Sequence, residues 1–281
     1  MALAKTQIRP AQQERNEVHN MKTINTNNET MIKVENVYKT FGKKGGAITQ
    51  VLDGANLTVN KGEFVSLMGA SGSGKSTLLY LIGGLDRDFT GDISICGTSI
   101  RKMREKKLSK IRLGHIGFIF QFYNLVQNLN VEDNILLPSL VAGRSRASMK
   151  KELDEILEIT GLTEKRKQMP SKLSGGQQQR VAIARAIISN PQIILADEAT
   201  GNLDSKSGAE IMELFRKINR EKGITILQVT HSQKCAEYGT RTVVLENGKT
   251  VDERASMWLP SSHKPTFQEL EGRLATSMSR S

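Results

Sequence analysis

The sequence predicts an α/β fold whose core is a mostly parallel sheet. Short apolar runs bounded by turn signals, which are typical of buried strands, alternate along the chain with segments of helical spacing. Strands that alternate with helices pack as a parallel sheet covered by helices. Near the N-terminus the pattern differs, because Ile32 and Val34 alternate with polar residues before a turn at Gly45-Gly46. This pattern adds an antiparallel β part to the predicted fold.

Both kinds of element can be located along the chain. One expected helix has apolar residues from Met149 to Leu157 at helical spacing and stops at Gly161, and another, which buries Ile211 and Ile218, stops at Gly223. The apolar runs expected as core strands are Phe64–Met68, Ile116–Phe120, Ile193–Ala196 and Ile224–Val229.

The same patterns divide the chain into a body and two tails. Residues 1–30 are polar and lack periodicity, and residues 255–281 are rich in serine, so we expect a mobile N-terminal tail and a loose C-terminal tail. The body, residues 31–254, is expected to contain an inserted α-helical subdomain at about residues 122–185, where helix patterns dominate.

Composition and charge exclude several classes of protein. With 38% hydrophobic and 25% charged residues, the 281-residue chain is neither collagen-like nor disordered. No apolar run approaches the about 18 residues of a membrane-spanning helix. Two cysteines imply no disulfide framework and fit a reducing cytoplasm.

The net charge of +11 lies mainly inside the body. Residues 101–172 hold 15 Lys and Arg against 8 Asp and Glu. A basic surface favours an anionic neighbour, either nucleic acid or a phospholipid face, and a solvated helix surface is the alternative interpretation.

One glycine-rich segment carries a phosphate-binding motif. It matches G-x-x-x-x-G-K-[ST], follows an expected strand and opens a helix, which is the context that the motif requires. Glycines let backbone N–H groups curl around phosphate oxygens, and the helix N-terminus adds a favourable partial charge. We expect Lys75 to reach the β- and γ-phosphates and the Ser76 hydroxyl to bind Mg²⁺. The residues expected to bind nucleotide here are Gly69, Ala70, Ser71, Gly72, Ser73, Gly74, Lys75, Ser76 and Thr77.

A second strand ends in two acids. The apolar run from Ile193 places Asp197 and Glu198 at the carboxyl edge of the sheet, where ligands collect in open α/β folds. Asp197 is suited to bind Mg²⁺ directly or to contact the groups that bind it, and Glu198 is suited to polarise an attacking water. An ordinary surface acid pair at a strand end is the alternative interpretation.

A further motif indicates the family. Leu173-Ser174-Gly175-Gly176-Gln177, followed by Gln178-Gln179-Arg180 and an apolar helix, resembles the signature of ATP-binding cassette (ABC) proteins. The order of motifs is also similar to that family: phosphate loop, Gln121, signature, acidic strand, Asp204 and His231. The resemblance covers about residues 31–254 and implies a P-loop NTPase fold.

The residues within and around these motifs resemble one branch of that family. The stretches GEFVSLMGASGSGKSTLL, IGFIFQFYNL, LSGGQQQRVAIARA and ILADEATGNLD are similar to the ATPases of macrolide exporters, lipoprotein-release systems, cell-division partners and antimicrobial-peptide resistance transporters.

The resemblance implies roles for individual residues. Phe41 matches the aromatic residue that stacks on adenine, with Tyr38 as the competing candidate. Gln121 matches the glutamine that contacts Mg²⁺ and senses the γ-phosphate, and His231 matches the histidine that contacts the γ-phosphate and the attacking water. The implied catalytic residues are Glu198, His231 and Lys75, and the implied metal ligands are Ser76, Gln121 and Asp197.

The resemblance also implies a second copy of the chain, with a homodimer favoured. Ser174, Gly176 and Gln177 would close over ATP held by the partner, and Asp204 would cross the interface. Three positions depart from the usual family pattern: Ala70 and Ala199 replace a common proline, and Ser232 replaces a common aspartate. None of these departures removes a catalytic group.

The function implied is that of an ATP-hydrolysing subunit at the cytoplasmic face of a membrane, bound through a separate transmembrane permease. It would power export or extraction of a peptide, drug or lipid-linked molecule. The basic stretch Arg101–Arg112 would face the membrane surface, and nucleic acid is not an expected partner. One alternative is a signalling or mechanical subunit, as in cell division, that moves no substrate. A cassette ATPase acting on DNA or ribosomes is a second alternative, although tandem cassettes and a long coiled-coil insertion are both lacking.

Overall fold

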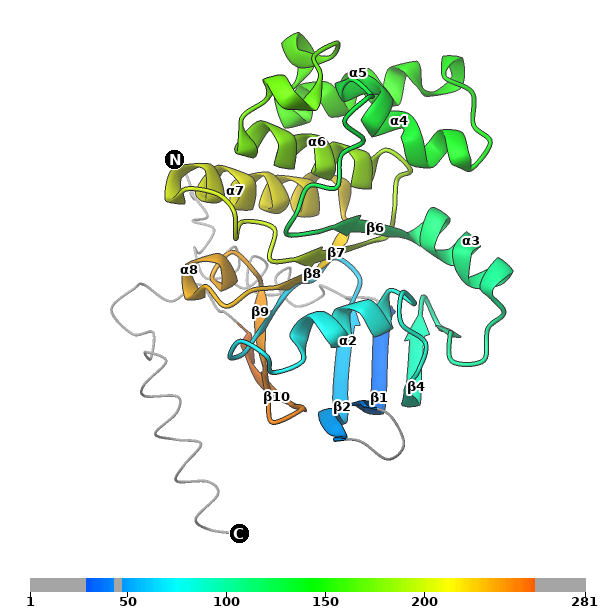
Figure 1. Ribbon diagram of the computed structural model, residues 1–281, viewed down its shortest axis with the longest axis vertical. Helices are drawn as coiled ribbons and strands as arrows, with labels where there is room; N and C mark the ends of the chain where they lie inside the picture. The colour runs from blue at the N-terminus through cyan, green and yellow to red at the C-terminus, as the bar shows by residue number, and fades with distance from the viewer. Residues whose placement is uncertain (1–28, 43–46, 256–281) are drawn as a thin grey trace, which may run out of the picture.

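The computed structural model describes residues 29–42 and 47–255, which are coloured in Figure 1. Within them, β1 begins at Thr30 and β10 ends at Ala255. The predicted turn at Gly45-Gly46 lies outside the described residues, as do residues 1–28 of the predicted N-terminal tail and 256–281 of the predicted C-terminal tail.

The described strands form two sheets. One has the order β2-β1-β4-β5 and is antiparallel, and the other has the order β10-β9-β3-β8-β7-β6. In the second sheet the strands from β9 to β6 run parallel, and β10 adds an antiparallel edge. The bounds are β1 (Thr30–Phe41), β2 (Thr49–Asn60), β3 (Phe64–Met68), β4 (Thr90–Ile95), β5 (Thr98–Ser99), β6 (Ile116–Ile119), β7 (Ile193–Asp197), β8 (Thr225–Val229), β9 (Arg241–Glu246) and β10 (Lys249–Ala255).

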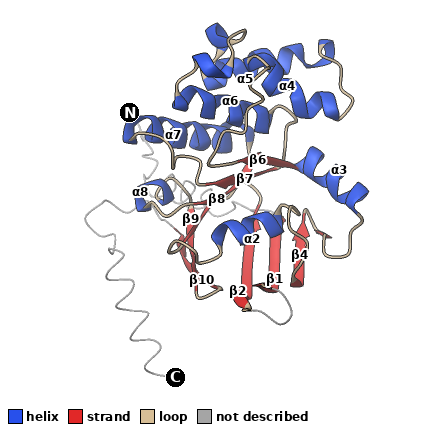
Figure 2. Cartoon of the chain, viewed as in Figure 1, coloured by secondary structure: helices blue, strands red, loops and turns tan. Residues whose placement is uncertain are grey.

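Helices cover both faces of the core sheet. Figure 2 shows α2 and the antiparallel sheet on one side and the layer α4 to α7 on the other. The bounds are α2 (Lys75–Ile82), α3 (Glu105–His115), α4 (Val131–Val141), α5 (Lys150–Thr160), α6 (Gly175–Ile187), α7 (Ser205–Lys222) and α8 (Gln233–Ala236). Among the described residues, none of these helices has the length and hydropathy needed to span a bilayer.

Two hydrophobic cores meet across the core sheet because its strands alternate their side chains. In β8, Ile226 packs with α4 to α7, whereas Leu227 packs with α2 and the antiparallel sheet. In β7, Ile194 and Leu195 divide in the same way. Successive residues of a strand point to opposite faces, so a strand buried on both faces reads as one continuous apolar run.

The structure confirms the predicted α/β class with its antiparallel N-terminal part. β3 has the predicted bounds, and the other predicted core strands agree within one residue. Gly161 and Gly223 end α5 and α7 with φ of 68° and 65°, a left-handed conformation that glycine adopts readily. Between β6 and β7 the structure has helices and no strand. The bounds of about residues 122–185 for the helical subdomain stay a prediction.

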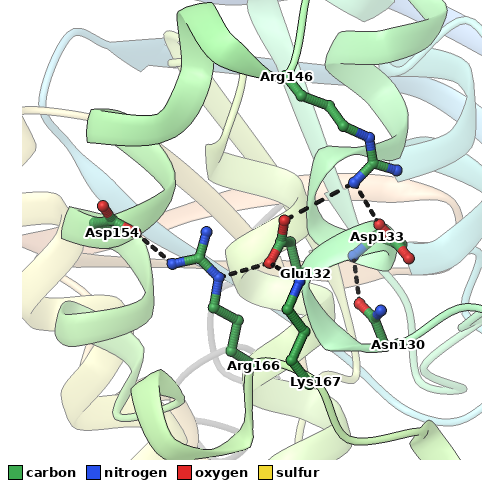
Figure 3. Close-up of polar contacts among 7 residues, drawn as sticks. All are labelled: Asn130, Glu132, Asp133, Arg146, Asp154, Arg166 and Lys167. Atoms are coloured by element: carbon green, nitrogen blue, oxygen red, sulfur yellow. Dashed lines mark hydrogen bonds and ion pairs between the residues drawn. The ribbon is translucent and has the colours of Figure 1, made fainter.

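A charge network joins α4 to α5 in the helical layer (Figure 3). Glu132, at the start of α4 and only 9% exposed, accepts from Arg166 at 2.6 Å and Lys167 at 2.9 Å, and Arg146 lies 3.8 Å away. Arg166 also binds Asp154 of α5 at 2.6 Å. Burial raises the pKa of Glu132, but the hydrogen bonds and charges of Arg166 and Lys167 outweigh it and leave this pKa below its usual value.

Candidate active site

The phosphate loop joins β3 to α2 and needs its glycines. Gly69, Gly72 and Gly74 have φ of 155°, 78° and 96°, a region that residues with a side chain rarely adopt. A Cβ on Gly74 would lie 2.9 Å from the carbonyl oxygen of Val51, and one on Gly69 would lie 2.3 Å from that of Leu245. The loop therefore rests tightly on β2 and β9, with its backbone facing the cleft that these strands border.

Lys75 folds back over the loop. Its Nζ donates to the carbonyl oxygens of Gly69 at 2.9 Å and Ala70 at 2.7 Å, and the residue is 5% exposed. Burial lowers the pKa of Lys75, and the charges of Glu198 and Asp197 oppose this shift. The ammonium group is thus held over the same loop whose N–H groups can bind phosphate.

The carboxylate of Asp197 is positioned by two hydroxyl groups of α2. Ser76 Oγ donates to Asp197 Oδ1 at 2.8 Å, and the Tyr80 hydroxyl donates to Oδ2 at 2.7 Å. Burial, together with the hydrogen bond and the charge of Asp197, raises the pKa of Tyr80 to about 12. The phenol therefore remains a protonated donor at neutral pH.

Tyr80 is a site residue that sequence reasoning missed. It lies four residues after Ser76, so both hydroxyl groups lie on one face of α2. The available signal was a polar group within the apolar run Leu78–Ile82.

Glu198 and His231 meet at the carboxyl edge of the sheet. His231 Nδ1 lies 3.1 Å from Glu198 Oε1, and the Glu198 N–H donates to the Val229 carbonyl at 3.0 Å. Glu198 has φ of 44°, which is unusual for a residue with a side chain and is a form of strain found at functional sites. The chain turns sharply as it leaves β7, and the carboxylate of Glu198 meets the histidine that follows β8.

Gln121 follows β6 and contacts the segment after Glu198. Asn202 Nδ2 donates to the Gln121 carbonyl oxygen at 2.9 Å, and a Cβ on Gly201 would lie 3.2 Å from Gln121 Nε2. Within the described residues the Gln121 side chain makes no hydrogen bond. Its amide group is therefore available to a ligand.

A cleft of about 730 Å³ opens beside the phosphate loop. The loop from Gly69 to Ser73, Thr49 of β2 and His231 all border it. Phe41 is 47% exposed and pairs with Thr49, whereas Tyr38 pairs with Asp53. This register favours Phe41 over Tyr38 as the residue that stacks on a base, an assignment that stays a prediction.

Comparisons with known proteins identify the family. The ABC transporter family model matches residues 52–201. The lipoprotein-releasing system ATP-binding protein LolD 1 of Rhodopseudomonas palustris is 44% identical over 220 residues, which are 78% of this chain and 97% of that protein. The chain belongs to the ABC transporter family.

Two further relatives extend the comparison. The macrolide export ATP-binding/permease protein MacB of Chlorobaculum tepidum is 42% identical over 224 residues, 80% of this ABC protein but only 34% of MacB's length. The ATP-binding cassette MJ0796 of Methanocaldococcus jannaschii, solved as a dimer in a post-hydrolysis state with ADP and Pi, is similar at 41% identity and a TM-score of 0.74. That comparison covers 82% of this chain and 100% of the other. This ABC protein is an ATPase with the ABC ATPase fold.

The signature residues of this ABC ATPase lie away from its own phosphate loop. Ser174 caps α6: its Oγ accepts from the Gln177 N–H at 3.3 Å, and Gln177 Oε1 accepts from the Ser174 N–H at 3.0 Å. A Cβ on Gly176 would lie 3.4 Å from Ser207 of α7. Because α6 and α2 pack on opposite faces of the core sheet, one chain does not bring these residues together with Lys75.

The described hydrogen-bond partners of the Asp204 side chain are two residues of α7. Its carboxylate accepts from the N–H groups of Lys206 and Ser207 at 3.0 Å and from Ser207 Oγ at 2.7 Å, which caps α7. The hydrogen bonds from Ser207 lower the pKa of Asp204. Ser232 acts in the same way at α8, where its hydroxyl accepts from the Cys235 N–H at 3.4 Å.

The side chains around Asp197 fit Mg²⁺. Asp197 is 6% exposed and accepts from two neutral hydroxyls, and no ion pair reaches it within the described residues. A buried carboxylate without a cation is costly, so a metal would complete the site. Magnesium is typically bound through one or two carboxylates together with substrate phosphates, and not by a cage of acids. A single carboxylate, Asp197, with the polar side chains of Ser76 and Gln121 fits this pattern. The described residues contain no group of three His, Cys, Asp or Glu that could hold a metal.

Proposed function

We propose that this ABC ATPase dimerises around two ATP molecules and drives a separate membrane permease that exports or extracts a peptide, drug or lipid-linked molecule. The observation that carries the proposal is the division of the site. One face of the core sheet has the phosphate loop with Asp197, Glu198 and His231 at its edge, and the other has the signature helix. A second chain supplies the signature that each loop lacks.

The hydrolytic step uses residues of one chain, from the phosphate loop and from the carboxyl edge of the core sheet. Lys75 and the loop N–H groups bind the β- and γ-phosphates, and Ser76, Gln121 and Asp197 hold Mg²⁺. When bound, Mg²⁺ neutralises charge on the phosphate oxygens. Glu198 accepts a proton from water as the water oxygen bonds to the γ-phosphorus, and the bond to the ADP oxygen breaks. His231, 3.1 Å from Glu198, orients that carboxylate and the water.

Glu198→Gln tests the assignment of the base. The amide keeps the size of the side chain but does not accept the proton, so we expect ATP binding to persist and turnover to fall by about 100-fold or more. Turnover close to that of the unaltered protein would remove Glu198 from the mechanism.

A mixing experiment tests whether the site is shared between chains. Lys75→Ala removes the phosphate contact and Ser174→Arg blocks the signature, and each variant alone should hydrolyse little ATP. A mixed dimer contains one intact composite site, so single-turnover hydrolysis should return on mixing. If co-purification through a tag on one variant shows mixed dimers and hydrolysis stays absent, sharing of the site is refuted.

A groove next to the catalytic edge is suited to a permease segment. It has a volume of about 540 Å³ and lies between α3, β6, α4 and α6, with Leu85, Leu113, Phe118 and Phe120 among its walls. Arg185 supports the groove floor by donating to the carbonyls of Tyr123 and Asn124 at 2.9 and 2.6 Å, and burial lowers the pKa of Arg185. The strand that forms this wall continues into Gln121, so a bound segment would lie next to a metal-binding candidate.

Affinity capture from detergent-solubilised membranes, followed by mass spectrometry, tests the partner. We expect a stoichiometric protein with several membrane spans, and Leu113→Glu in the groove should reduce its yield. Lys217→Glu on α7, away from the groove, is the matched control. Capture of only soluble proteins or nucleic acid with the unaltered chain would overturn the permease proposal and leave the ATPase chemistry intact.

The cations of residues 101–110 favour an anionic membrane surface near α3. Seven cations lie between residues 101 and 112, and only Arg112 makes a salt bridge, to Glu105. The other six have no acidic partner in the described residues: Arg101, Lys102, Arg104, Lys106, Lys107 and Lys110. α3 also borders the groove through Leu113, so a permease bound there would bring these cations toward the bilayer.

Charge reversal tests the membrane contact. The triple change Arg101→Glu, Arg104→Glu and Lys107→Glu should weaken binding to phosphatidylglycerol vesicles, with no binding to phosphatidylcholine vesicles in either protein. The control changes the same net charge on α7, at Lys217, Arg220 and Lys222. Equal losses from both triple variants would indicate a non-specific effect of net charge.

A further inference from the structure

Tyr80 belongs to a chain of contacts that leads from the groove to the Asp197 carboxylate. Its hydroxyl donates to Asp197 Oδ2 at 2.7 Å, and its ring lies 6.4 Å from the ring of Phe120. The Phe120 ring stacks on Phe118 at 5.7 Å with the two planes 4° apart. Phe118 and Phe120 both border the groove, whereas Asp197 is buried at the catalytic edge.

The position of this ring stack is tightly constrained. A Cβ on Gly83, at the end of α2, would lie 2.3 Å from the Phe118 ring, so the ring packs directly against the helix backbone. Tyr80 lies less than one turn earlier on the same helix. A shift of the rings in the groove wall therefore acts on the side chain that holds Asp197, since packed side chains move together.

Ser76 and Tyr80 have different relations to the metal. The Ser76 hydroxyl is itself an expected metal ligand, so its hydrogen bond to Asp197 is available only while it is not otherwise engaged. The Tyr80 hydroxyl, by contrast, contacts Asp197 alone among the described polar groups. It is thus the neutral donor that can keep one carboxylate oxygen fixed while the other faces the ligand.

We propose that Tyr80 is a positioning residue that orients the Asp197 carboxylate toward Mg²⁺ and ATP, and that the Phe118–Phe120 stack lets an occupant of the groove alter this orientation. The first part depends only on the ATPase. The second part rests on the proposed docking of a permease in the groove. The two parts are tested by different variants.

Tyr80→Phe tests the positioning role, because it removes the hydroxyl and keeps the ring. Affinity for a non-hydrolysable ATP analogue should fall by about 10-fold with Mg²⁺ present, the size typical of lost outer contacts to a metal ligand, and should stay unchanged in EDTA. The kcat should fall with it, and the Mg²⁺ concentration for half-maximal turnover should rise. Equal analogue affinity in Mg²⁺ for the variant and the unaltered protein would overturn the positioning role.

Tyr238→Phe is the matched control. The Tyr238 ring lies under Arg216, and its hydroxyl makes no hydrogen bond within the described residues, so its removal should leave binding and turnover unchanged. Thermal unfolding of both variants detects any general loss of structure. If the affinity of Tyr80→Phe for the analogue falls as much in EDTA as in Mg²⁺, the hydroxyl has a structural role, which would contradict the proposal.

Phe120→Leu tests the link to the groove without any permease. The variant keeps an apolar side chain but removes the ring against Tyr80, so the Mg²⁺-dependent affinity should fall by about 3-fold in the same direction. Combined with Tyr80→Phe it should add nothing, because the ring acts through the lost hydroxyl. Additive losses would separate the two residues and overturn the link, while the result for Tyr80 would stand whatever the permease experiments show.

Discussion

Two buried carboxylates in different halves of the molecule have opposite surroundings. Glu132, in the helical layer, binds Arg166 and Lys167 and lies near Arg146 (Figure 3). Asp197, at the end of β7, accepts from two neutral hydroxyl groups. The first carboxylate has salt-bridge partners within the chain, whereas the second has two hydroxyl donors and no salt bridge among the described residues, although the charge of Lys75 acts on it. An acid whose cations are already present holds structure together, whereas an acid that is only oriented is ready for a ligand.

The largest expected effect is on catalysis. Asp197→Asn keeps the hydrogen-bonding oxygen but removes the charge, so kcat should fall by about 100-fold or more. Stability should change by less than about 1 kcal/mol, because the change also removes the cost of burying an unpaired charge. Steady-state hydrolysis and thermal unfolding measure the two. A large loss of stability with normal turnover would reverse the comparison.

Glu132→Ala should have the opposite profile. Removing the acid leaves Arg166 and Lys167 without this partner, and both are partly exposed, so we expect a loss of about 2 kcal/mol rather than the larger value of a fully buried pair. Denaturant unfolding gives the loss. ATP turnover per folded molecule should be nearly unchanged, and a catalytic defect with unchanged stability would contradict the structural role.

Lowering the pH should remove the stabilisation that the Glu132 carboxylate provides. The pKa of Glu132 is below its ordinary value of 4.5 in the folded protein. The stabilisation is therefore complete above about pH 4.5 and is lost as the pH falls through the lower folded-state pKa. The stability difference between the unaltered protein and Glu132→Gln, measured across this range, should shrink at the acid end. A difference that grows as pH falls would exclude this linkage.

The smallest effect is expected at the edge of the network. Arg146 is half exposed and lies 3.8 Å from Glu132, although it also contacts Asp133 at 2.6 Å. Arg146→Ala should cost about 0.5 kcal/mol, as exposed ion pairs do, and this cost should decrease at high salt. Denaturant unfolding at two salt concentrations tests it. A cost equal to that of Glu132→Ala would mean that the burial of an ion pair in this network does not determine how much it contributes to stability.

The basic region shows how much a count of charges can predict. Residues 101–172 appear in the sequence as one cationic stretch, but the structure divides them. Arg144, Arg146, Arg166 and Lys167 pair with acids of the helical layer, whereas the cations of 101–110 do not. Pairing depends on which helices pack together, so composition alone could not separate an internally neutralised layer from a cationic face.

Several features of the site were predictable because local chemistry determines them. The phosphate loop requires glycines at fixed positions, and Gly69, Gly72 and Gly74 have the positive φ that this requires. Apolar runs buried on both faces identified β3 and β7, and with them the strand end that bears Asp197 and Glu198. The helix stops at Gly161 and Gly223 followed from the same local rules.

Tyr80 and the aromatic stack were not predictable in this way. Tyr80 reads as one more position in an apolar helix, and Phe118 and Phe120 read as strand residues. Their relation exists only because the C-terminal part of α2 packs against Phe118 and Phe120, while Tyr80 reaches Asp197 at the end of β7. The same reason explains Glu132, whose partners come from 14 to 35 residues along the chain.

The sequence by itself determined the class of fold, the phosphate loop and the order of the motifs, because glycine conformation, apolar periodicity and residue spacing are local properties. Tertiary structure alone decided which acids form salt bridges, which hydroxyls donate to Asp197, and that the signature helix lies across the sheet from the loop. These depend on contacts between segments far apart in the chain, and the packing of whole faces against one another sets those contacts.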